Sequence, residues 1–280
     1  MEQNIKIVRV TDRESFKQLE AFQTIFFGRG DIIPYHVLIA FQEIGGLVLV
    51  AYDQNNRPLG FLCGYNSFKN GEVFHYIHFC GVLPEYSDTE LSTQLRIAVR
   101  EYLLDEDILR AIWLIDPLNP FEAYISIHKL GGTGREYMRN FYGLMRDPYN
   151  RGLESDRLVI NWNLDSKEVE EKISGKFKDE VDKVCVDDLE KSVIIVRDGP
   201  FKRILDYKLN LNGDRFCLEI PIDIESMKKK DLSTAIEWRE ITRRIFEHYI
   251  PRGYIVTEVL KDSRNNSCYY IFEKKSMQRS

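Results

Sequence analysis

Residues 47–82, LVLVAYDQNNRPLGFLCGYNSFKNGEVFHYIHFCGV, decide the fold class of this 280-residue chain. The stretch contains three runs rich in β-branched, aromatic and other apolar residues, at 47–52, 59–65 and 73–82. Between them stand Asp, Asn, Pro and Gly, which favour turns because they accept positive φ or bond to their own backbone. Apolar runs bounded by such residues predict strands. The stretch therefore predicts a three-stranded antiparallel meander.

The residues on either side of the meander predict helices and one more strand. Residues 5–10 predict a first strand, and Asp12 is expected to cap a helix that starts just after it. A second helix is expected over 34–43, with Pro34 in its first turn. After the meander, five residues share one helix face by spacing: Leu91, Leu95, Ala98, Val99 and Tyr102.

Strand and helix patterns alternate in the next part of the chain. Residues 112–115 predict a strand that ends at Asp116-Pro117, residues 121–130 a helix, and residues 137–143 a further strand. A hairpin meander followed by β-α-β units implies one mixed, mostly antiparallel sheet with helices on its faces. The fold class predicted for this part is therefore α+β.

The C-terminal part predicts a smaller α+β domain after a charged helix. Residues 165–191 are dense in acids and lysines, and Asp165 with Glu168 forms a capping box. Beyond them we expect short strands, a helix capped by Asp231, and a closing hairpin. The predicted organisation is a first domain over 1–164, a charged linker helix over 165–191, and a C-terminal α+β domain over 192–280.

Composition limits the classes of function. The chain has 39 Lys and Arg against 44 Asp and Glu, a formal net charge of −5, so we expect no general nucleic-acid binder, which needs a basic face. No apolar run approaches the roughly 20 residues of a membrane helix, and the first residues lack a signal peptide's apolar core. The five cysteines are widely spaced, without a metal-ligand pattern. We expect a cytoplasmic protein with reduced thiols, no metal and no membrane contact.

A series of short, different motifs is spread over nearly the whole chain. In order, they are Asp116-Pro117-Leu118, Lys129-Leu130-Gly131, Tyr137, Asn140, Tyr142-Gly143, Gly152, Ser155-Asp156-Arg157, Trp162, Pro221, Asp223, Trp238-Arg239, Arg243 and Gly253-Tyr254. With the predicted element order, this pattern resembles the GNAT superfamily of acyl-CoA-dependent N-acetyltransferases. More narrowly, it resembles GNAT-like proteins with a C-terminal extension.

The resemblance implies a way of binding acetyl-CoA. In GNAT enzymes the third strand of the meander separates from its neighbour, and its backbone pairs with the pantetheine arm. A loop Arg/Gln-x-x-Gly-x-Gly/Ala then opens a helix, whose N–H groups hold the pyrophosphate. The cofactor-binding residues implied here are Cys80, Val82, Ser87, Thr89, Leu91 and Ser92.

The loop of this chain departs from that pattern. Ser87 stands at the Arg/Gln position, and Asp88, Glu90 and Ser92 stand where small residues are expected, with no glycine between Pro84 and Leu104. Glu122 replaces a family asparagine. Each carboxylate facing a pyrophosphate costs on the order of 1 kcal/mol in a partly solvated loop. Two alternatives stay open: acetyl-CoA binds at an atypical site, or the site has lost it.

The resemblance also implies catalytic residues. Tyr137 or Tyr142 would protonate the leaving thiolate, and His78 on the third strand would deprotonate the amine, since histidine titrates near pH 6.5. From the residues alone, the alternative for each is packing: a core or rim tyrosine, and a strand histidine satisfied by a neighbour.

A polar loop carries the candidate substrate-binding residues. Arg157, beside Asp156, would hold a substrate carboxylate or phosphate. The alternative is an Asp–Arg pair that fixes the loop to the C-terminal part.

Two hypotheses about function follow from these observations. The first is an acyl-CoA-dependent N-acyltransferase acting on a small amine or amino acid. The second is a non-catalytic GNAT-fold protein that binds a ligand or partner in the former substrate cleft. Under either hypothesis the expected partner is a small molecule, and the sequence leaves the oligomeric state open.

Overall fold

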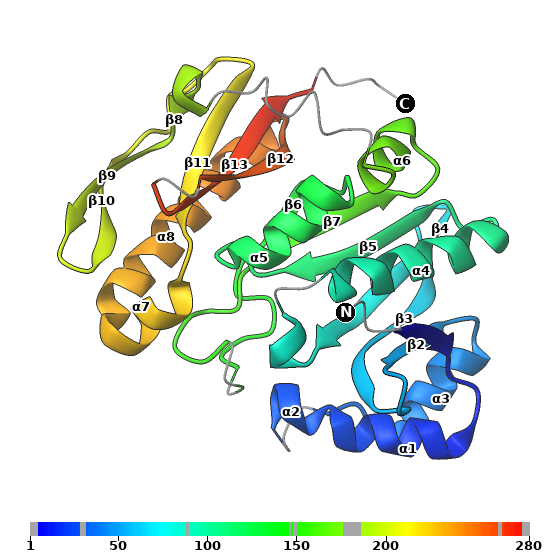
Figure 1. Ribbon diagram of the computed structural model, residues 1–280. Helices are drawn as coiled ribbons and strands as arrows, with labels where there is room; N and C mark the ends of the chain where they lie inside the picture. The colour runs from blue at the N-terminus through cyan, green and yellow to red at the C-terminus, as the bar shows by residue number, and fades with distance from the viewer. Residues whose placement is uncertain are drawn as a thin grey trace. The chain divides into compact units, whose positions relative to one another are not determined.

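The structure, a computed structural model, describes residues 5–28, 32–87, 90–145, 147, 150–175, 186–262 and 265–275. The chain divides into two compact units (Figure 1). Unit 1 consists of residues 1–113 and 163–166, and unit 2 of residues 114–162 and 167–280.

Unit 1 is a sheet with helices on both faces. Its elements are β1 (Lys6–Arg9), α1 (Arg13–Phe22), α2 (Thr24–Phe27), α3 (Tyr35–Glu43), β2 (Leu47–Tyr52), β3 (Pro58–Lys69), β4 (Glu72–Val82), the 3-10 helix η1 (Pro84–Tyr86), α4 (Leu91–Asp105) and β5 (Arg110–Ile115), whose last two residues belong to unit 2. The strand order is β1-β2-β3-β4-β5, antiparallel except for the parallel pair β4–β5. The predicted meander is therefore confirmed.

Local sequence explains the turns of the meander. Asp53 Oδ1 accepts hydrogen bonds from the N–H groups of Asn55 and Arg57, at 2.8 and 2.9 Å, which closes the β2–β3 turn. Asn70 and Gly71 both have positive φ, 56° and 85°. Two successive positive φ values define the type I′ hairpin turn, whose twist matches that of the flanking strands.

Apolar side chains bury the two faces of the unit 1 sheet under different helices. On one face, Phe22 and Phe26 from α1 and α2 contact Phe61 of β3, and Phe26 also contacts Phe79 of β4. On the other face, Ser92 of α4 lies against β4. Asp12 caps α1 by accepting the N–H of Ser15, as predicted.

Unit 2 contains a series of sheet strands, a separate two-stranded ribbon and several helices. Its elements are α5 (Pro120–Ala123), the π-helix η2 (Tyr124–Lys129), β6 (Thr133–Met138), β7 (Arg157–Asn163), α6 (Lys167–Ile173), the 3-10 helix η5 (Val186–Asp188), β8 (Glu190–Lys191), β9 (Val193–Asp198), β10 (Phe201–Tyr207), β11 (Arg215–Pro221), α7 (Ile224–Lys230), α8 (Leu232–Tyr249), the 3-10 helix η6 (Ile250–Arg252), β12 (Tyr254–Asp262) and β13 (Ser267–Lys274). The sheet order within the unit is β7-β6-β12-β13-β11-β8, and β9 pairs with β10 alone. The predicted α+β class and mostly antiparallel sheet are confirmed.

Two predicted elements differ from the structure. The strand expected over 137–143 is wrong: β6 ends at Met138, and Asn140 (φ 43°) and Gly143 (φ 72°) have the positive φ that ends a strand. The strand β7 was not predicted, although its run RLVINWN is buried at every residue except the last. Because β7 is buried along nearly its whole length, it lacks the polar–apolar alternation that marks a half-buried strand.

The charged segment is shorter as a helix than predicted. Within it, α6 covers only Lys167–Ile173, followed by a turn at Ser174 and Gly175. Residues 176–185 lie outside the described residues, and Val186–Asp188 and Glu190–Lys191 form a 3-10 helix and a short strand. A single linker helix over 165–191 is therefore not what the described residues show.

The helix after β5 changes from α to π geometry at Tyr124. Buried Lys172 of α6 donates to Ile127 O at 3.0 Å and to Glu258 Oε2 at 2.9 Å. His128 Nδ1 lies 2.9 Å from the other oxygen of Glu258. This cluster connects the π-helix to α6 and to β12, so three segments that are far apart in the sequence contact one another in unit 2.

Residues 114–162 depend on the C-terminal region for their packing. β6 pairs with β12 at Gly134 and Val256, and Tyr270 Oη donates to Pro117 O at 3.0 Å. The fully buried carboxylate of Asp156 is bound by Arg243. The predicted domain boundaries at 164 and 191 stay predictions, because compactness does not test whether a segment folds alone.

We expect a fragment of residues 1–164 to fold less stably than the whole chain. The fragment lacks Arg243, and a buried carboxylate without its partner costs about 3–5 kcal/mol, a large share of a domain's total stability of about 5–15 kcal/mol. Thermal unfolding followed by circular dichroism measures the difference. Cooperative unfolding of the fragment at the midpoint of the whole chain would contradict the expectation.

A pair of neighbouring arginines separates this contact from the general effect of truncation. In the whole chain, Arg243→Gln is expected to lower the free energy of unfolding by about 3–5 kcal/mol. Arg244→Gln is the matched control, because Arg244 is exposed and its side chain donates to the Tyr207 hydroxyl. It should change stability by about 0.5 kcal/mol or less. Equal effects would show that Asp156 does not depend on Arg243.

Candidate functional site

A β-bulge in β4 places His78 out of the regular ladder. Cys63 of β3 lies opposite Phe79, and the next residue, Gly64, lies opposite Ile77, so His78 has no partner on β3. A bulge redirects the side chains beside it. His78 and Phe79 therefore follow each other on the same face of the sheet.

The strands β4 and β5 pair only where they begin. His75 lies opposite Ala111 and Tyr76 opposite Ile112, and no further pairs of these two strands occur in the described structure. β4 continues for six residues after Tyr76. The edge of β4 that faces away from β3 is thus left without a strand ladder over residues 77–82.

Backbone alternation shows which groups face this open edge. Leu83 N donates to Leu59 O of β3 at 2.7 Å. Because the inward and outward backbone groups of an antiparallel pair alternate with a period of two, Gly81 also faces β3. Cys80 and Val82 therefore direct their N–H and C=O groups toward the open edge.

The segment after β4 enters α4 without glycine. Pro84–Tyr86 forms the 3-10 helix η1, and Ser87 closes it by donating from N and Oγ to Pro84 O, at 3.2 and 2.8 Å. Asp88 and the predicted cofactor residue Thr89 lie outside the described residues. Glu90 is exposed at the start of α4, where its side chain forms no cap. An acid therefore stands at the positive end of a fifteen-residue helix.

A buried arginine lies beneath this helix start. Arg96 is only 3% exposed, and its Nη1 donates to Ser92 Oγ and, at 3.4 Å, to Ser92 O. Its guanidinium lies 5.7 Å from the ring centre of Trp113 on β5, and Ser92 Oγ lies 3.7 Å from Cys80 Sγ on β4. This cluster connects the two diverging strands with α4.

Sequence reasoning did not single out Arg96. Its signal was available, because Arg96 is four residues after Ser92 and one after Leu95, on the buried face of α4. Arginine is rarely fully buried unless it is paired. An arginine on the inward face of a predicted helix therefore indicates a buried polar contact at that position.

His78 stands among aromatic rings at the exposed end of the bulge. Its ring centre lies 6.1 Å from that of Phe41, 6.4 Å from Tyr65 and 6.2 Å from Tyr76. Desolvation by these neighbours lowers the pKa of His78 below its ordinary value, although part of the ring stays exposed. At neutral pH the imidazole is therefore predominantly uncharged and able to accept a proton.

His75 has a different environment from His78. It is fully buried on the opposite face, with Nδ1 2.7 Å from Asn66 Oδ1, and Asn66 in turn donates to Gly45 O. Burial lowers the pKa of His75 to about 4. Its uncharged ring packs the sheet and does not reach solvent.

In unit 2, Tyr137 and Asp156 belong to one buried network. The Tyr137 hydroxyl donates to Asp156 Oδ2 at 2.6 Å, Asn140 N donates to Oδ1 at 2.9 Å, and Arg243 donates to both oxygens at 2.8 Å. Burial raises the pKa of Asp156, but the hydrogen bonds from Arg243 and Tyr137 outweigh it and the net pKa is lowered. Burial, with the neighbouring negative charge of Asp156, raises the pKa of Tyr137 well above its ordinary value.

Tyr142 and Arg157 lie together beside that network. Tyr142 is 45% exposed, and the guanidinium of Arg157 lies 5.2 Å from its ring centre. Arg157 also donates to Asn150 Oδ1 at 2.6 Å and to Asp156 O at 2.8 Å. Ser155 Oγ accepts a hydrogen bond from Tyr142 N and donates one to Gly143 O. The polar loop between β6 and β7 is thus held by its own hydrogen bonds.

A second buried arginine of α8 binds the end of β5. Arg239 Nη2 donates to both oxygens of Asp116, at 2.7 and 2.6 Å. Its Nε and Nη1 atoms have no hydrogen-bond partner among the described residues. The contact joins two residues that are 123 positions apart in the sequence.

The structure assembles the predicted site residues in two groups. His78, Cys80, Val82, Ser87, Leu91 and Ser92 belong to unit 1, with Cys80 and Ser92 in contact. Tyr137, Tyr142, Asp156 and Arg157 belong to unit 2, around the Asp156 carboxylate. The roles assigned to these residues stay predictions.

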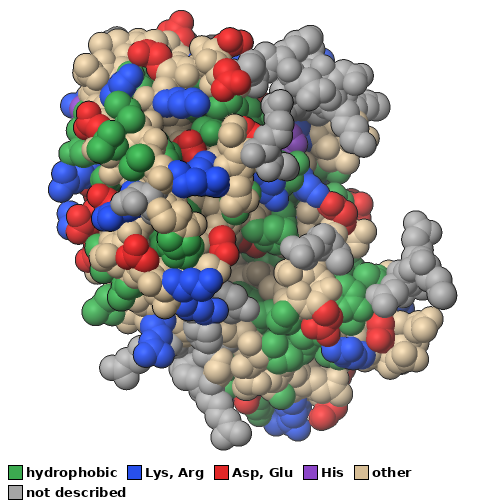
Figure 2. Space-filling model, turned by 60° about the vertical axis from the view of Figure 1, so that its left-hand side comes forward, with side chains coloured by type: hydrophobic (Ala, Val, Ile, Leu, Met, Phe, Trp, Pro, Cys, Tyr) green, Lys and Arg blue, Asp and Glu red, His purple; other side chains and the backbone are tan. Residues whose placement is uncertain are grey.

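The described residues show neither a metal centre nor a membrane-spanning helix. They contain no group of three or more His, Cys, Asp or Glu side chains placed to hold a metal ion. Among the same residues, no helix combines the length and apolar character that a membrane span requires. On the face shown in Figure 2, acidic and basic side chains are interspersed and not gathered by sign.

Comparisons with known proteins find similarity at the level of structure. No protein-family model matches the chain, and no curated protein has a similar sequence. Among solved structures, the chain is similar to Naa50 of Arabidopsis thaliana (20% identity, 56% of this chain and 97% of that one, TM-score 0.44) and to a putative acetyltransferase of Acinetobacter baylyi (16%, 59% and 96%, 0.48). It is also similar to the ribosomal-protein-S18-alanine N-acetyltransferase of Escherichia coli (12%, 58% and 95%, 0.46).

Similarity at these identities carries no information on substrate or activity. The element order of the structure itself, a strand, helices, a three-stranded meander, α4, β5 and a further helix and strands, matches the order that the resemblance implied. The early end of the β4–β5 ladder matches it as well. The chain therefore has a GNAT-like fold.

Proposed function

We propose that the chain is an acyl-CoA-dependent N-acyltransferase whose acyl donor lies along the open edge of β4. The observation that carries the proposal is the end of the β4–β5 ladder at Tyr76, with Cys80 and Val82 directed to the unpaired edge. A pantetheine arm has two amide groups, which pair with such an edge as an added strand does. Each hydrogen bond contributes about 0.5–1.5 kcal/mol.

The reaction we propose transfers the acyl group from sulfur to nitrogen. The amine nitrogen attacks the thioester carbonyl, the new C–N bond forms, and the C–S bond breaks. In this scheme His78 accepts the proton that the amine loses, because its imidazole is uncharged at neutral pH and stands at the bulge where the strands diverge. The proton that the thiolate needs comes from solvent.

The phosphate end of the donor fits the chain less well. Glu90 stands at the start of α4, Ser87 replaces the basic residue of the GNAT loop, and no glycine brings the backbone close to a pyrophosphate. Arg96 is the buried cation nearest in sequence, but its guanidinium is turned toward Ser92 and Trp113. We therefore expect the pantetheine portion to supply most of the binding energy.

The acidic helix start also favours a second candidate function. If Glu90 and its neighbours exclude CoA, unit 1 still retains the unpaired edge of β4. The chain would then be a non-catalytic GNAT-fold protein that binds a small ligand along the same edge. The binding of pantetheine derivatives and of whole CoA separates the two.

We expect S-acetylpantetheine and acetyl-CoA to bind within about threefold of each other, because the β4 edge contacts the part that they share. In Ser87→Arg/Glu90→Gly, two changes of about 1 kcal/mol each should tighten acetyl-CoA about thirtyfold. The same variant should leave S-acetylpantetheine unchanged. Isothermal titration calorimetry measures both ligands.

Glu101→Lys is the matched control for charge. It changes the net charge by the same two units, on an exposed residue of α4 two turns or more from the helix start. Acetyl-CoA should bind this variant as it binds the unmodified chain. If neither S-acetylpantetheine nor acetyl-CoA binds at millimolar concentration, the acyltransferase proposal is rejected. Binding of S-acetylpantetheine without turnover would favour the second candidate function.

We expect His78→Gln to lower kcat for acyl transfer by about 10²–10⁴, the usual contribution of a general base. For the unmodified chain, activity should fall as the pH drops through the pKa of His78, below 6.5, because protonation removes the base. Release of free thiol from acetyl-CoA, measured against a panel of primary amines and amino acids, follows the reaction.

The control for this substitution is His36→Gln. His36 is exposed on α3 and lies in the same unit, so a general loss of stability or a buffer effect would change both variants alike. Full activity of His78→Gln, or an unchanged acidic limb of its pH profile, would remove His78 from the mechanism.

A further inference from the structure

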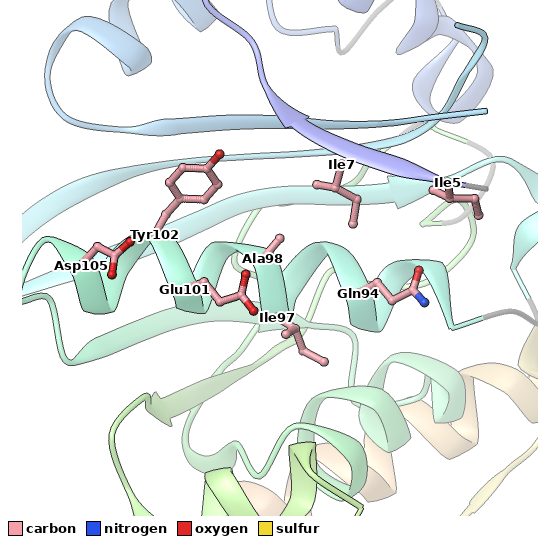
Figure 3. Close-up of a pocket in the computed structure, with 8 residues that line it drawn as sticks. All are labelled: Ile5, Ile7, Gln94, Ile97, Ala98, Glu101, Tyr102 and Asp105. Atoms are coloured by element: carbon pink, nitrogen blue, oxygen red, sulfur yellow. The ribbon is translucent and has the colours of Figure 1, made fainter. Parts of the chain in front are cut away.

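An open groove runs between the first strand and the long helix of unit 1, away from the β4 edge. Its volume is about 520 Å³. Eight residues of β1, its approach and α4 line it: Ile5, Ile7, Gln94, Ile97, Ala98, Glu101, Tyr102 and Asp105. Figure 3 shows β1 running beside α4, with Ile7 pointing toward the helix near Ala98. The volume is in the range of pockets that hold several side chains.

One side of this groove is the free edge of the sheet. β1 is the outermost strand of unit 1, and β2 is its one neighbour in the described sheet. Val10 N donates to Val48 O at 2.9 Å, so by alternation Val8 and Lys6 also face β2. The backbone N–H and C=O groups of Ile7 and Arg9 therefore point outward.

An unpaired edge accepts another strand. Four residues make a short edge strand, which limits unspecific pairing, but Ile7 adds a side chain that points into the groove. An added strand would thus bond to the backbone of Ile7 and Arg9 while its alternate side chains enter the groove. Backbone pairing with side-chain pockets is the usual form of peptide recognition by strand addition.

The chemistry of the groove selects the occupant. Its apolar lining comes from isoleucines and an alanine, together with the ring of Tyr102, which is 36% exposed. Glu101 and Asp105 are its charged residues, both exposed, and no Lys, Arg or His lines it. A segment with apolar residues on one side and basic residues on its flank complements this surface.

A second copy of this chain fits the groove less well. A symmetric pairing of two β1 edges brings the same surface of both copies together. The acids Glu101 and Asp105 of one copy would then approach the same acids of the other, which disfavours the contact. The charge of the groove therefore points to a basic segment from a different protein.

We propose that β1 and this groove bind an extended, basic segment of a partner protein, which adds as a strand to β1 and directs apolar side chains between Ile7 and α4. The lysines or arginines of the segment stand at further positions on the same face of the added strand as its apolar residues, so that they also point toward α4 and lie against Glu101 and Asp105. This interaction is independent of the acyl-donor site, since its residues do not include those of the β4 edge.

The test uses the full chain and synthetic peptides as probes. A fluorescein-labelled peptide, Ser-Val-Ser-Val-Ser-Lys-Ser-Lys (the Lys/Val peptide), carries its valines and lysines on one face of a strand. It is compared with the Glu/Val counterpart, in which Glu replaces Lys, by fluorescence anisotropy in low salt and in 0.5 M salt. The Lys/Val peptide should bind at least about tenfold more tightly in low salt, and salt should weaken it. Equal binding of the two peptides would overturn the proposal.

Charge variants locate the contact. Glu101→Lys/Asp105→Lys should weaken the Lys/Val peptide by about tenfold or more. Glu106→Lys is compared with the single variant Glu101→Lys, which changes the net charge equally, because Glu106 is an exposed acid of the same region that does not line the groove. These surface changes leave the core intact, so circular dichroism should show the same fold. A double variant that binds as the unmodified chain does would overturn the assignment of the site.

Modified peptides test the strand pairing itself. N-methylation at alternate residues along one peptide edge blocks its N–H groups, and methylation of the other edge leaves the pairing edge free. One of the two peptides should lose binding by about tenfold or more, and the other should retain it. Equal binding by both would show that no strand is added. Dimerisation of the chain alone, seen in sedimentation and abolished by Ile7→Asp, would identify a second copy as the occupant and overturn the proposal.

Discussion

A carboxylate buried without access to water must be bound on every side, and Asp156 imposes this requirement on unit 2. Arg243 from α8, the Tyr137 hydroxyl from β6 and the backbone of Asn140 supply the donors. An unpaired buried charge costs several kcal/mol. The segment from β6 to β7 therefore depends on a helix that begins some 75 residues later. The C-terminal region is thus a structural part of unit 2 and not an addition to an already complete fold.

Local signals explain the parts of the fold that could be predicted. The Asn70-Gly71 turn, the Asp12 and Asp231 caps and the apolar runs of the meander all act between near neighbours, and each is present in the structure. The parts that could not be predicted depend on distant partners. β7 is buried by its neighbours in the sheet and gives no alternation, and Arg239 pairs with an acid far along the chain.

The candidate site shows the same division. The resemblance implied Cys80 and Val82 as cofactor-binding residues, a role that stays a prediction. The ladder registers direct the backbone groups of both residues to the unpaired edge of β4. The bulge at His78 and the burial of Arg96 were not predicted, because both depend on how three elements meet. In the proposed site, backbone hydrogen bonds favour the donor's pantetheine arm while the charge at the start of α4 opposes its phosphates. The balance of these two effects decides whether the fold serves catalysis or binding alone.

The bulge in β4 has a consequence for insertions and deletions in the chain. Cys63 stays opposite Phe79 and Gly64 opposite Ile77 whether or not a residue stands between them. Deleting His78 would therefore leave a regular β3–β4 hairpin in which Phe79 still faces Phe61 and Cys80 still faces α4. The hairpin does not need this residue for its register or its packing order. Among the residues of β4, His78 is thus one that can be gained or lost in a single step without exchanging the two faces of the sheet.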